Sequence, residues 1–332
     1  MKNKVNITAH SLSPQGDELI TVLATFPRII LAEINTHRML SKNTSSSRAI
    51  PFKKMVESVQ NNPFIPIAWQ KHHSGMQGND YITGDYDIAM AQTRWLRARD
   101  EAINNAQILN SEVIGVTKQL CNRLLEPFMW TTMLITGSKE SWDNFFSLRS
   151  PSYEIGVNKF KSKKDVLDYY SDEPNYIELK NYTDLDWLQL NKGQAEIHMM
   201  MLSEKIYDCI QESVPKQLKN EWHIPFEDKI NELYSNLTLE DKIKVSVGIA
   251  ANTSYTIVGD GSIITLEKAT RIHDKCKELN HSSVFEHCAK AMSNAEYESF
   301  YKGQIGLGGE SGWCNNLKGF IPYRYMIDNN LI

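Results

Sequence analysis

Cysteine is scarce in this sequence, and the few cysteines are scattered along it. Only five of the 332 residues are cysteine, and no two of them are spaced as in a CxxC motif. An odd, irregular set argues against a disulfide framework and against a structural zinc site. We therefore expect reduced thiols, no metal and a cytoplasmic location. The cysteines are Cys121, Cys209, Cys276, Cys288 and Cys314.

Long apolar runs and a strong charge of one sign are also missing. No run is long enough to cross a bilayer, and the residues from Met1 to Asn6 lack the apolar core of a signal peptide. A formal net charge of -4 gives no argument for binding nucleic acid or a membrane surface. Because 41% of the residues are hydrophobic, we expect a globular chain with a substantial core.

A dinucleotide fingerprint is absent as well. Glycines gather between Gly303 and Gly319, but the order of strand, GxGxxG and helix is not found there. We find no internal repeat and no low-complexity tract. A chain of 332 residues is long enough for one large domain or two small ones. The stretch from 150 to 191, rich in Lys, Asp, Tyr and Ser, changes character and is predicted to be an insertion.

The remaining pattern predicts a mixture of helices and strands. A β-branched run from Glu18 to Phe26 indicates a strand, and Pro27 is suited to open a helix that reaches Leu40. Thr238 and Thr265 are expected to cap two later helices. Apolar spacing predicts further helices over 87–113, 116–125, 139–149, 163–170, 193–211, 239–251 and 266–279.

The run from Thr36 to Arg48 is the most informative stretch of the chain. Its small polar residues end in an arginine, so the backbone N–H groups of Ser45 to Ser47 and the Arg48 guanidinium could hold a phosphate monoester. A plain surface loop with a chance arginine is the alternative interpretation. The run alone does not separate the two.

Together with other motifs, this run resembles the signature of the flavin-dependent thymidylate synthase family, RHRxxSxNExSxRY. A second block, from Asn144 to Arg149, is similar to the NFLxLR element of that family, and Gln194 to Ile197 is similar to AQxEI. A third group near the C-terminus resembles AARVSF, over 250–255, and HxTPFEH, over 281–287. The signature residues that match in register are His37, Arg38, Ser41, Asn43, Ser46 and Arg48.

The order of these motifs differs from that of ordinary family members. In those members the third group precedes the signature, whereas here it follows. Because domain termini often lie close together at the surface, a circular permutation accounts for this order. The resemblance implies a single domain over residues 1–332 with an α/β (α+β) fold, in which a curved, mostly antiparallel sheet is flanked by helices in permuted order. It also implies a homotetramer whose active sites are shared between subunits.

The resemblance implies a one-carbon transfer to C5 of a pyrimidine deoxynucleotide monophosphate, with dUMP as the first expectation. FAD would be the cofactor, and NADPH and methylenetetrahydrofolate the co-substrates. By the same resemblance Arg149 is catalytic and, with Glu33, Ser46, Ser47, Arg48 and Arg123, binds the nucleotide. The FAD site would comprise His37, Arg38, Asn43, Thr44, Ser138, Asn144, Ser254, His281 and Ser283.

Ordinary structural roles compete with several of these assignments. Ser254 and Ser283 could be turn or cap residues, and His37 could be a core histidine. Arg149 could compensate a helix dipole at the end of its helix. For Glu286 and His287 we favour structural roles over a metal site, since no third ligand has suitable spacing.

Four departures from the family pattern leave the reaction open. Thr36, Thr44, Glu33 and Lys192 stand where the family has arginine, glutamate, glutamine and histidine. Such changes could allow a dCMP substrate, or water trapping of the methylene to give a hydroxymethyl product. A non-catalytic nucleotide-binding paralogue that has lost flavin is a further alternative.

Overall fold

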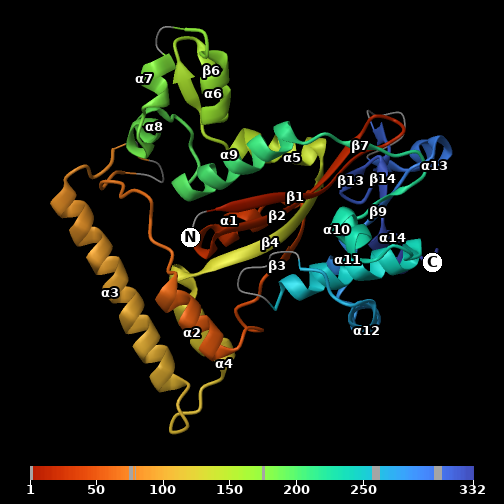
Figure 1. Ribbon diagram of the computed structural model, residues 1–332, viewed down its shortest axis with the longest axis horizontal. Coiled ribbons are helices and arrows are strands. Elements are labelled where there is room, and N and C mark those ends of the chain that lie inside the picture. The colour runs from red at the N-terminus through yellow and green to blue at the C-terminus, as the bar shows by residue number, and fades with distance from the viewer. Residues whose placement is uncertain (1–2, 75–77, 79, 174–175, 256–261, 303–308) are drawn as a thin grey trace.

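The computed structural model describes residues 3–74, 78, 80–173, 176–255, 262–302 and 309–332. Its centre is a five-stranded sheet in the order β3-β4-β2-β1-β7, seen edge-on in Figure 1. Every pairing in it is antiparallel except that of β1 with β7. The strands are β1 Lys4–Leu12, β2 Glu18–Pro27, β3 Ser41–Thr44, β4 Trp130–Ser138 and β7 Lys216–Gln217.

The central strands are buried on both faces, and their side chains alternate between two different cores. On β2, Ile20 and Val22 belong to one core, whereas Leu23 belongs to the other. Threonines occupy matched positions on β2 and β4. Thr21 bonds to Thr136 at 2.7 Å and Thr25 to Thr132 at 2.9 Å, so the buried hydroxyls satisfy one another across the strands.

One face of the sheet is covered by α1, α5 and α9, whose aromatic and methionine side chains supply the first core. Trp142 and Phe145 of α5 and Met199 of α9 are almost fully buried there. In Figure 1, α5 and α9 run along this side of the sheet. The helices are α1 Leu31–Asn35, α5 Lys139–Arg149 and α9 Ile197–Glu212, and the turn η1 Arg28–Ile30 precedes α1.

The opposite face is covered by α10 and α11, with α12 packed on α11. The predicted caps are confirmed, because Thr238 accepts from the N–H of Asp241 and Thr265 from that of Lys268. A Cβ at Gly248 would lie 3.1 Å from the Ala269 Cα, so this glycine allows α11 and α12 to approach closely. The helices are α10 Glu227–Leu233, α11 Leu239–Thr253 and α12 Leu266–Glu278, followed by η3 Ser282–Glu286.

A layer of helices extends from the end of the sheet and holds the long helix α3. Only Ile103 and Ala106 of α3 are buried, and they pack on the core of α2 and η2. Most of α3 therefore lies on the surface, and Figure 1 shows it running diagonally at one side of the molecule, apart from the central sheet. The elements are α2 Phe52–Asn61, α3 Asp85–Leu109, α4 Lys118–Cys121 and η2 Asn122–Phe128.

The C-terminal part adds a small three-stranded sheet, β14-β9-β8, and two short hairpins. This part lies beyond the end of the central sheet opposite α3 (Figure 1). Its elements are β8 Trp222–His223, β9 Ala289–Ala291, α13 Asn294–Ser299, β10 Tyr301–Lys302, β11 Glu310–Ser311, β12 Trp313–Cys314, β13 Leu317–Lys318, β14 Phe320–Pro322 and α14 Tyr323–Asp328.

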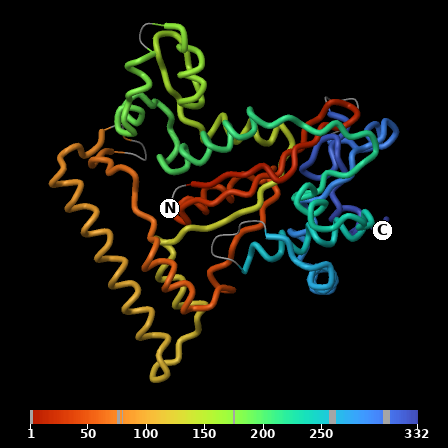
Figure 2. Tube along the Cα trace, viewed as in Figure 1, coloured from red at the N-terminus to blue at the C-terminus, as the bar shows by residue number. Residues whose placement is uncertain are grey.

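Residues 150–191 stand apart from the sheet, as the green trace in Figure 2 shows. They have a core of their own around Tyr153, Val166, Leu179 and Trp187. That they are an insertion stays a prediction. The elements are β5 Tyr153–Ile155, β6 Asn158–Phe160, α6 Lys163–Tyr169, α7 Tyr176–Lys180 and α8 Asp184–Leu190.

Glu204 of α9 fastens this segment to the rest of the chain. Its carboxylate accepts from the Lys163 N–H at 2.7 Å and from the Tyr153 hydroxyl at 3.2 Å. Burial raises the pKa of Glu204 to about 7, and nearby Asp208 adds to this, although the Lys163 N–H opposes it. Native Glu204 therefore binds its proton more tightly than the unfolded chain does.

The raised pKa predicts a stability that depends on pH. The free energy of unfolding should fall by about 1–3 kcal/mol as the pH rises from about 4.5 to about 7, because each pKa unit is worth about 1.4 kcal/mol. Glu204→Gln should flatten this dependence in urea unfolding curves. Glu57→Gln, at an exposed position of α2 away from this segment, should leave it unchanged. Equal pH dependence in wild type and Glu204→Gln would contradict the assignment.

The predicted fold class is confirmed, since a mostly antiparallel sheet carries helices on both faces. The predicted helix from Pro27 to Leu40 is wrong in its second half. It ends at Asn35, where the Lys42 ammonium binds the carbonyls of Ile34, Asn35 and His37. The expected loop after Leu40 begins instead with strand β3. Strands β1 and β4 were not predicted from the sequence.

Candidate functional site

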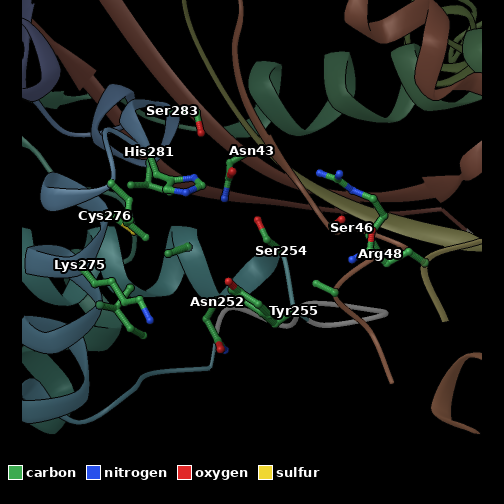
Figure 3. A pocket seen from close by; sticks show the side chains of 16 residues that line it. Asn43, Ser46, Arg48, Asn252, Ser254, Tyr255, Lys275, Cys276, His281 and Ser283 are labelled. Atoms are coloured by element: carbon green, nitrogen blue, oxygen red, sulfur yellow. The ribbon is translucent and has the colours of Figure 1, made fainter. Parts of the chain in front are cut away.

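A pocket of about 640 Å³ lies where β3 and its following turn meet the ends of α11, α12 and η3. Figure 3 shows its side chains converging from these segments. Six predicted site residues line it: Asn43, Ser46, Arg48, Ser254, His281 and Ser283. The other lining residues are Ala49, Gln119, Ala251, Asn252, Tyr255, Ile272, Lys275, Cys276, Leu279 and Val284.

Hydrogen bonds between distant segments hold the pocket together. The Ser46 N–H donates to the Ser254 carbonyl at 2.9 Å, and the buried Asn43 amide donates to the Ala250 carbonyl. The last turn of α11 thus receives donors from β3 and its turn, which satisfies carbonyls left free at a helix end. The cyclic motif order predicts that residues 250–287 lie beside residues 27–48, and this prediction is confirmed within one chain for the described residues of the two segments.

The charge of the pocket is one-sided. Arg48 and Lys275 line it, and neither forms an ion pair with any carboxylate in the described part of the chain. No aspartate or glutamate is found among the described lining residues. Although the chain as a whole carries a net charge of -4, the described lining of this pocket is locally positive.

Several lining residues were missed in the sequence. Asn252 and Tyr255 belong to the motif at 250–255, which offered a signal. Lys275 and Cys276 lie on α12, whose sequence indicates only an amphipathic helix. Burial raises the pKa of the Cys276 thiol, so it remains protonated near neutral pH and is a poor nucleophile.

The three serines ahead of Arg48 have different surroundings. The Ser45 hydroxyl pairs with that of Thr131 at 2.7 Å, and the Ser47 hydroxyl donates to Glu126 at 2.6 Å. Both serines are buried, and neither lines the pocket. Of the three, Ser46 alone lines it. The Ser45 and Ser47 hydroxyls therefore stabilise the turn through these hydrogen bonds.

A second group of predicted residues gathers around Arg149 at the end of α5. Its Nε donates to His37 Nε2 at 3.0 Å, and its Nη1 pairs with Glu33 at 3.2 Å. Thr36 accepts from Nη2 at 3.4 Å. The His37 ring also meets the edge of Phe145, with 4.9 Å between centroids. We call Glu33, Thr36, His37 and Arg149 the Arg149 cluster.

The Arg149 cluster shifts the pKa values of its own members. Burial, the Arg149 guanidinium and Lys42 lower the pKa of His37 to about 4, so His37 is neutral and accepts from Arg149. Burial raises the pKa of Glu33, and Arg149 partly offsets this. None of these residues lines the pocket; they belong to α1, its C-terminal turn and α5, on the other face of the sheet.

The remaining predicted site residues lie in neither group. Thr44 donates to the Thr132 carbonyl at 3.3 Å, and Ser138 is buried beside Ser141 at 3.2 Å. Arg38, Arg123 and Asn144 are exposed and do not line the pocket.

Glu286 and His287 are held by structural contacts. Glu286 pairs with Arg324, and the fully buried His287 bonds to Thr136 at 2.8 Å. Within the described ranges, no three His, Cys, Asp or Glu side chains are grouped as metal ligands. Among the described helices, none combines the length and apolar character needed to cross a membrane.

Comparisons with known proteins give similarities to solved structures and no sequence match. No protein-family model matches the chain, and a search of curated proteins finds no match. The UMP/dUMP methylase PolB from Streptomyces cacaoi bound with 5-Br UMP is 15% identical, with a TM-score of 0.41 over 64% of this chain and 89% of that one. The same enzyme bound with 5-Br dUMP is 12% identical, with a TM-score of 0.38 over 54% and 94%.

Thymidylate synthase X from Helicobacter pylori, with FAD and dUMP, is also similar. It is 14% identical, with a TM-score of 0.26 over 52% of this chain and 71% of that one. All three TM-scores lie below 0.5, so these similarities carry no argument about function. The assignment of the candidate site therefore depends on the geometry of the pocket and on the motif residues that line it.

Proposed function

We propose that this protein is an enzyme that binds a pyrimidine deoxynucleotide monophosphate and FAD, and transfers a one-carbon unit to C5 of the pyrimidine. One observation carries the proposal: residues from three separate motifs line a single pocket with two unpaired cations and no described carboxylate. Substrate and cofactor are both anionic, and both present planar rings with hydrogen-bonding edges. The pocket volume is within the range typical of ligand sites.

Arg48 and Ser46 would bind the phosphate of the nucleotide. Arg48 is exposed at the pocket and has no carboxylate partner among the described residues, so its guanidinium is available to donate to phosphate oxygens. The Ser46 N–H is already bonded to Ser254, so Ser46 would contribute its hydroxyl. The substrate would be dUMP or dCMP, since no described contact selects between their ring edges.

The donor set of the pocket fits a flavin nucleotide. Ser254, Ser283 and His281 offer hydroxyl and imidazole groups, and the cations favour a pyrophosphate. Bound FAD would supply hydride transfer between NADPH and the pyrimidine, to which methylenetetrahydrofolate gives its carbon. The residues of the chain would bind and orient these molecules and keep water from the reacting ring.

Arg149 would stabilise negative charge that develops on the pyrimidine. Within one chain the Arg149 cluster lies outside the pocket, so the proposal places it at the pocket of another copy in a homotetramer. The surface beside α3 and α4 supports association, because Val113 is 94% exposed and Leu120 59% exposed. In the proposed homotetramer these exposed apolar side chains would be covered by a second copy of the chain.

The proposed oligomer gives a direct prediction. A double change of Val113 and Leu120 to Asp should reduce the molar mass measured by light scattering after size exclusion, because it places charge in the interface. Val157→Asp is the matched control, since Val157 is 95% exposed in the segment 150–191, away from this surface. A monomeric wild type, or equal effects of both changes, would exclude this interface.

Ligand binding and product analysis test the function itself. Purified protein incubated with FAD should retain the flavin absorbance band through gel filtration, and calorimetry should detect dUMP or dCMP. Mass spectrometry after incubation with all co-substrates should then find a methylated nucleotide. A hydroxymethyl product would replace the methyl assignment, and nucleotide binding without flavin would indicate a non-catalytic paralogue. Binding of neither ligand would exclude the proposal.

A further inference from the structure

Helix α12 contributes one side of the pocket through residues at helical spacing. Ile272, Lys275, Cys276 and Leu279 all line it, with spacings of three or four residues. Lys275 brings the charge. Its neighbour Asp274 is bonded to His273 Nδ1 at 2.9 Å, and Lys275 has no ion pair in the described part of the chain.

Arg48 and Lys275 lie at opposite ends of the pocket. Figure 3 shows Arg48 at one end beside Ser46 and Lys275 at the other, with Ser254 between them. Both cations are exposed at the cavity and have no carboxylate partner among the described residues, so each is available to bind an anion. A nucleotide phosphate on Arg48 would leave Lys275 without a counter-charge.

We propose that Lys275 forms a second anion subsite, distinct from the phosphate site at Arg48. It would receive the pyrophosphate of FAD or a carboxylate of the folate co-substrate. This inference rests on the proposed function and assigns a role to a residue that none of the sequence motifs includes. The ammonium is a flexible point charge, which suits either kind of anion.

A structural role for Lys275 provides the control. Lys275 and Lys277 both lie in the last turn of α12, where cations interact favourably with the helix dipole. Lys277 is exposed and does not line the pocket. A dipole effect would therefore be shared by both lysines, whereas ligand binding would depend on Lys275 alone.

The test compares Lys275→Ala, Lys275→Arg and Lys277→Ala in the full chain, with FAD, tetrahydrofolate and dUMP titrated separately. Lys275→Ala should weaken FAD or tetrahydrofolate about tenfold or more, since a charge-assisted hydrogen bond is lost. The dUMP affinity should change less than about twofold. Lys275→Arg should retain most of the affinity, and Lys277→Ala should match wild type.

The outcomes separate this inference from the proposed function. A loss confined to FAD assigns the subsite to pyrophosphate, and a loss confined to tetrahydrofolate assigns it to carboxylate. If wild type binds dUMP and FAD but Lys275→Ala and Lys277→Ala behave alike, the subsite is excluded and the proposed function stands. A loss of affinity in Lys275→Ala that is confined to dUMP would also exclude the second anion subsite. If wild type binds none of the three ligands, the proposed function itself is contradicted, and the subsite with it.

Discussion

Arg48→Ala should weaken the binding of dUMP or dCMP roughly ten- to hundredfold. The Arg48 guanidinium lines the pocket and has no carboxylate partner in the part of the chain that the structure describes, so its removal should delete a charge-assisted bond to phosphate without breaking an ion pair there. Such a bond is worth about 1.5–3 kcal/mol. Isothermal titration of the purified variant with each nucleotide measures the change directly.

The control for Arg48 is an arginine of similar exposure elsewhere. Arg97 is exposed on α3 and does not line the pocket, so Arg97→Ala should bind nucleotide like wild type. Raising the salt concentration should reduce the difference in nucleotide affinity between wild type and Arg48→Ala, because salt partly screens the attraction between the guanidinium and the phosphate. Equal nucleotide affinities of Arg48→Ala and Arg97→Ala would show that Arg48 does not bind the phosphate.

Local chemistry allowed several features to be predicted from the sequence. Helix α5 was predicted with its observed bounds, 139–149, and the caps Thr238 and Thr265 follow from short-range hydrogen bonding. The meeting of residues 27–48 with residues 250–287 was predicted from cyclic motif order. That order predicts contacts between segments far apart in the sequence, which local sequence patterns do not predict.

Strands β3 and β4 were missed because local sequence patterns contain no information about which segments pair in the folded chain. β4 is buried along its whole length, so it lacks the polar alternation that indicates a half-exposed strand. The four residues of β3, Ser-Lys-Asn-Thr, have weak strand preference and become a strand only because β4 pairs with them. Tertiary pairing, rather than propensity, determines both.

The division of the predicted site residues into two groups could not be foreseen either. His37 and Asn43 are six positions apart, yet a helix turn and strand β3 send them to opposite faces of the sheet. Side chains alternate along a strand, so Asn43 meets α11, whereas Lys42 meets the end of α1. The sequence predicted a helix from Pro27 to Leu40 followed by a loop, without the strand that separates His37 from Asn43.

Arg149→Ala should lower turnover about a hundred- to a thousandfold, the effect typical of losing one group that stabilises developing charge. Its effect on nucleotide affinity should be smaller, because charge on the pyrimidine grows as the reaction proceeds. Single-turnover oxidation of the reduced flavin at saturating nucleotide isolates this step. Arg149→Lys should recover only part of the rate, since lysine keeps the charge without the planar fork.

The Arg149 cluster also supplies a readout that separates reactivity from folding. The guanidinium is one cause of the low pKa of His37, so in Arg149→Ala that pKa should rise from about 4, while burial keeps it below the ordinary value. NMR titration of the imidazole follows this change without any substrate. A raised His37 pKa with normal turnover at saturation would leave Arg149 a purely structural link between α1 and α5. A raised pKa together with slow turnover and near-normal affinity is the result that the proposed reaction requires.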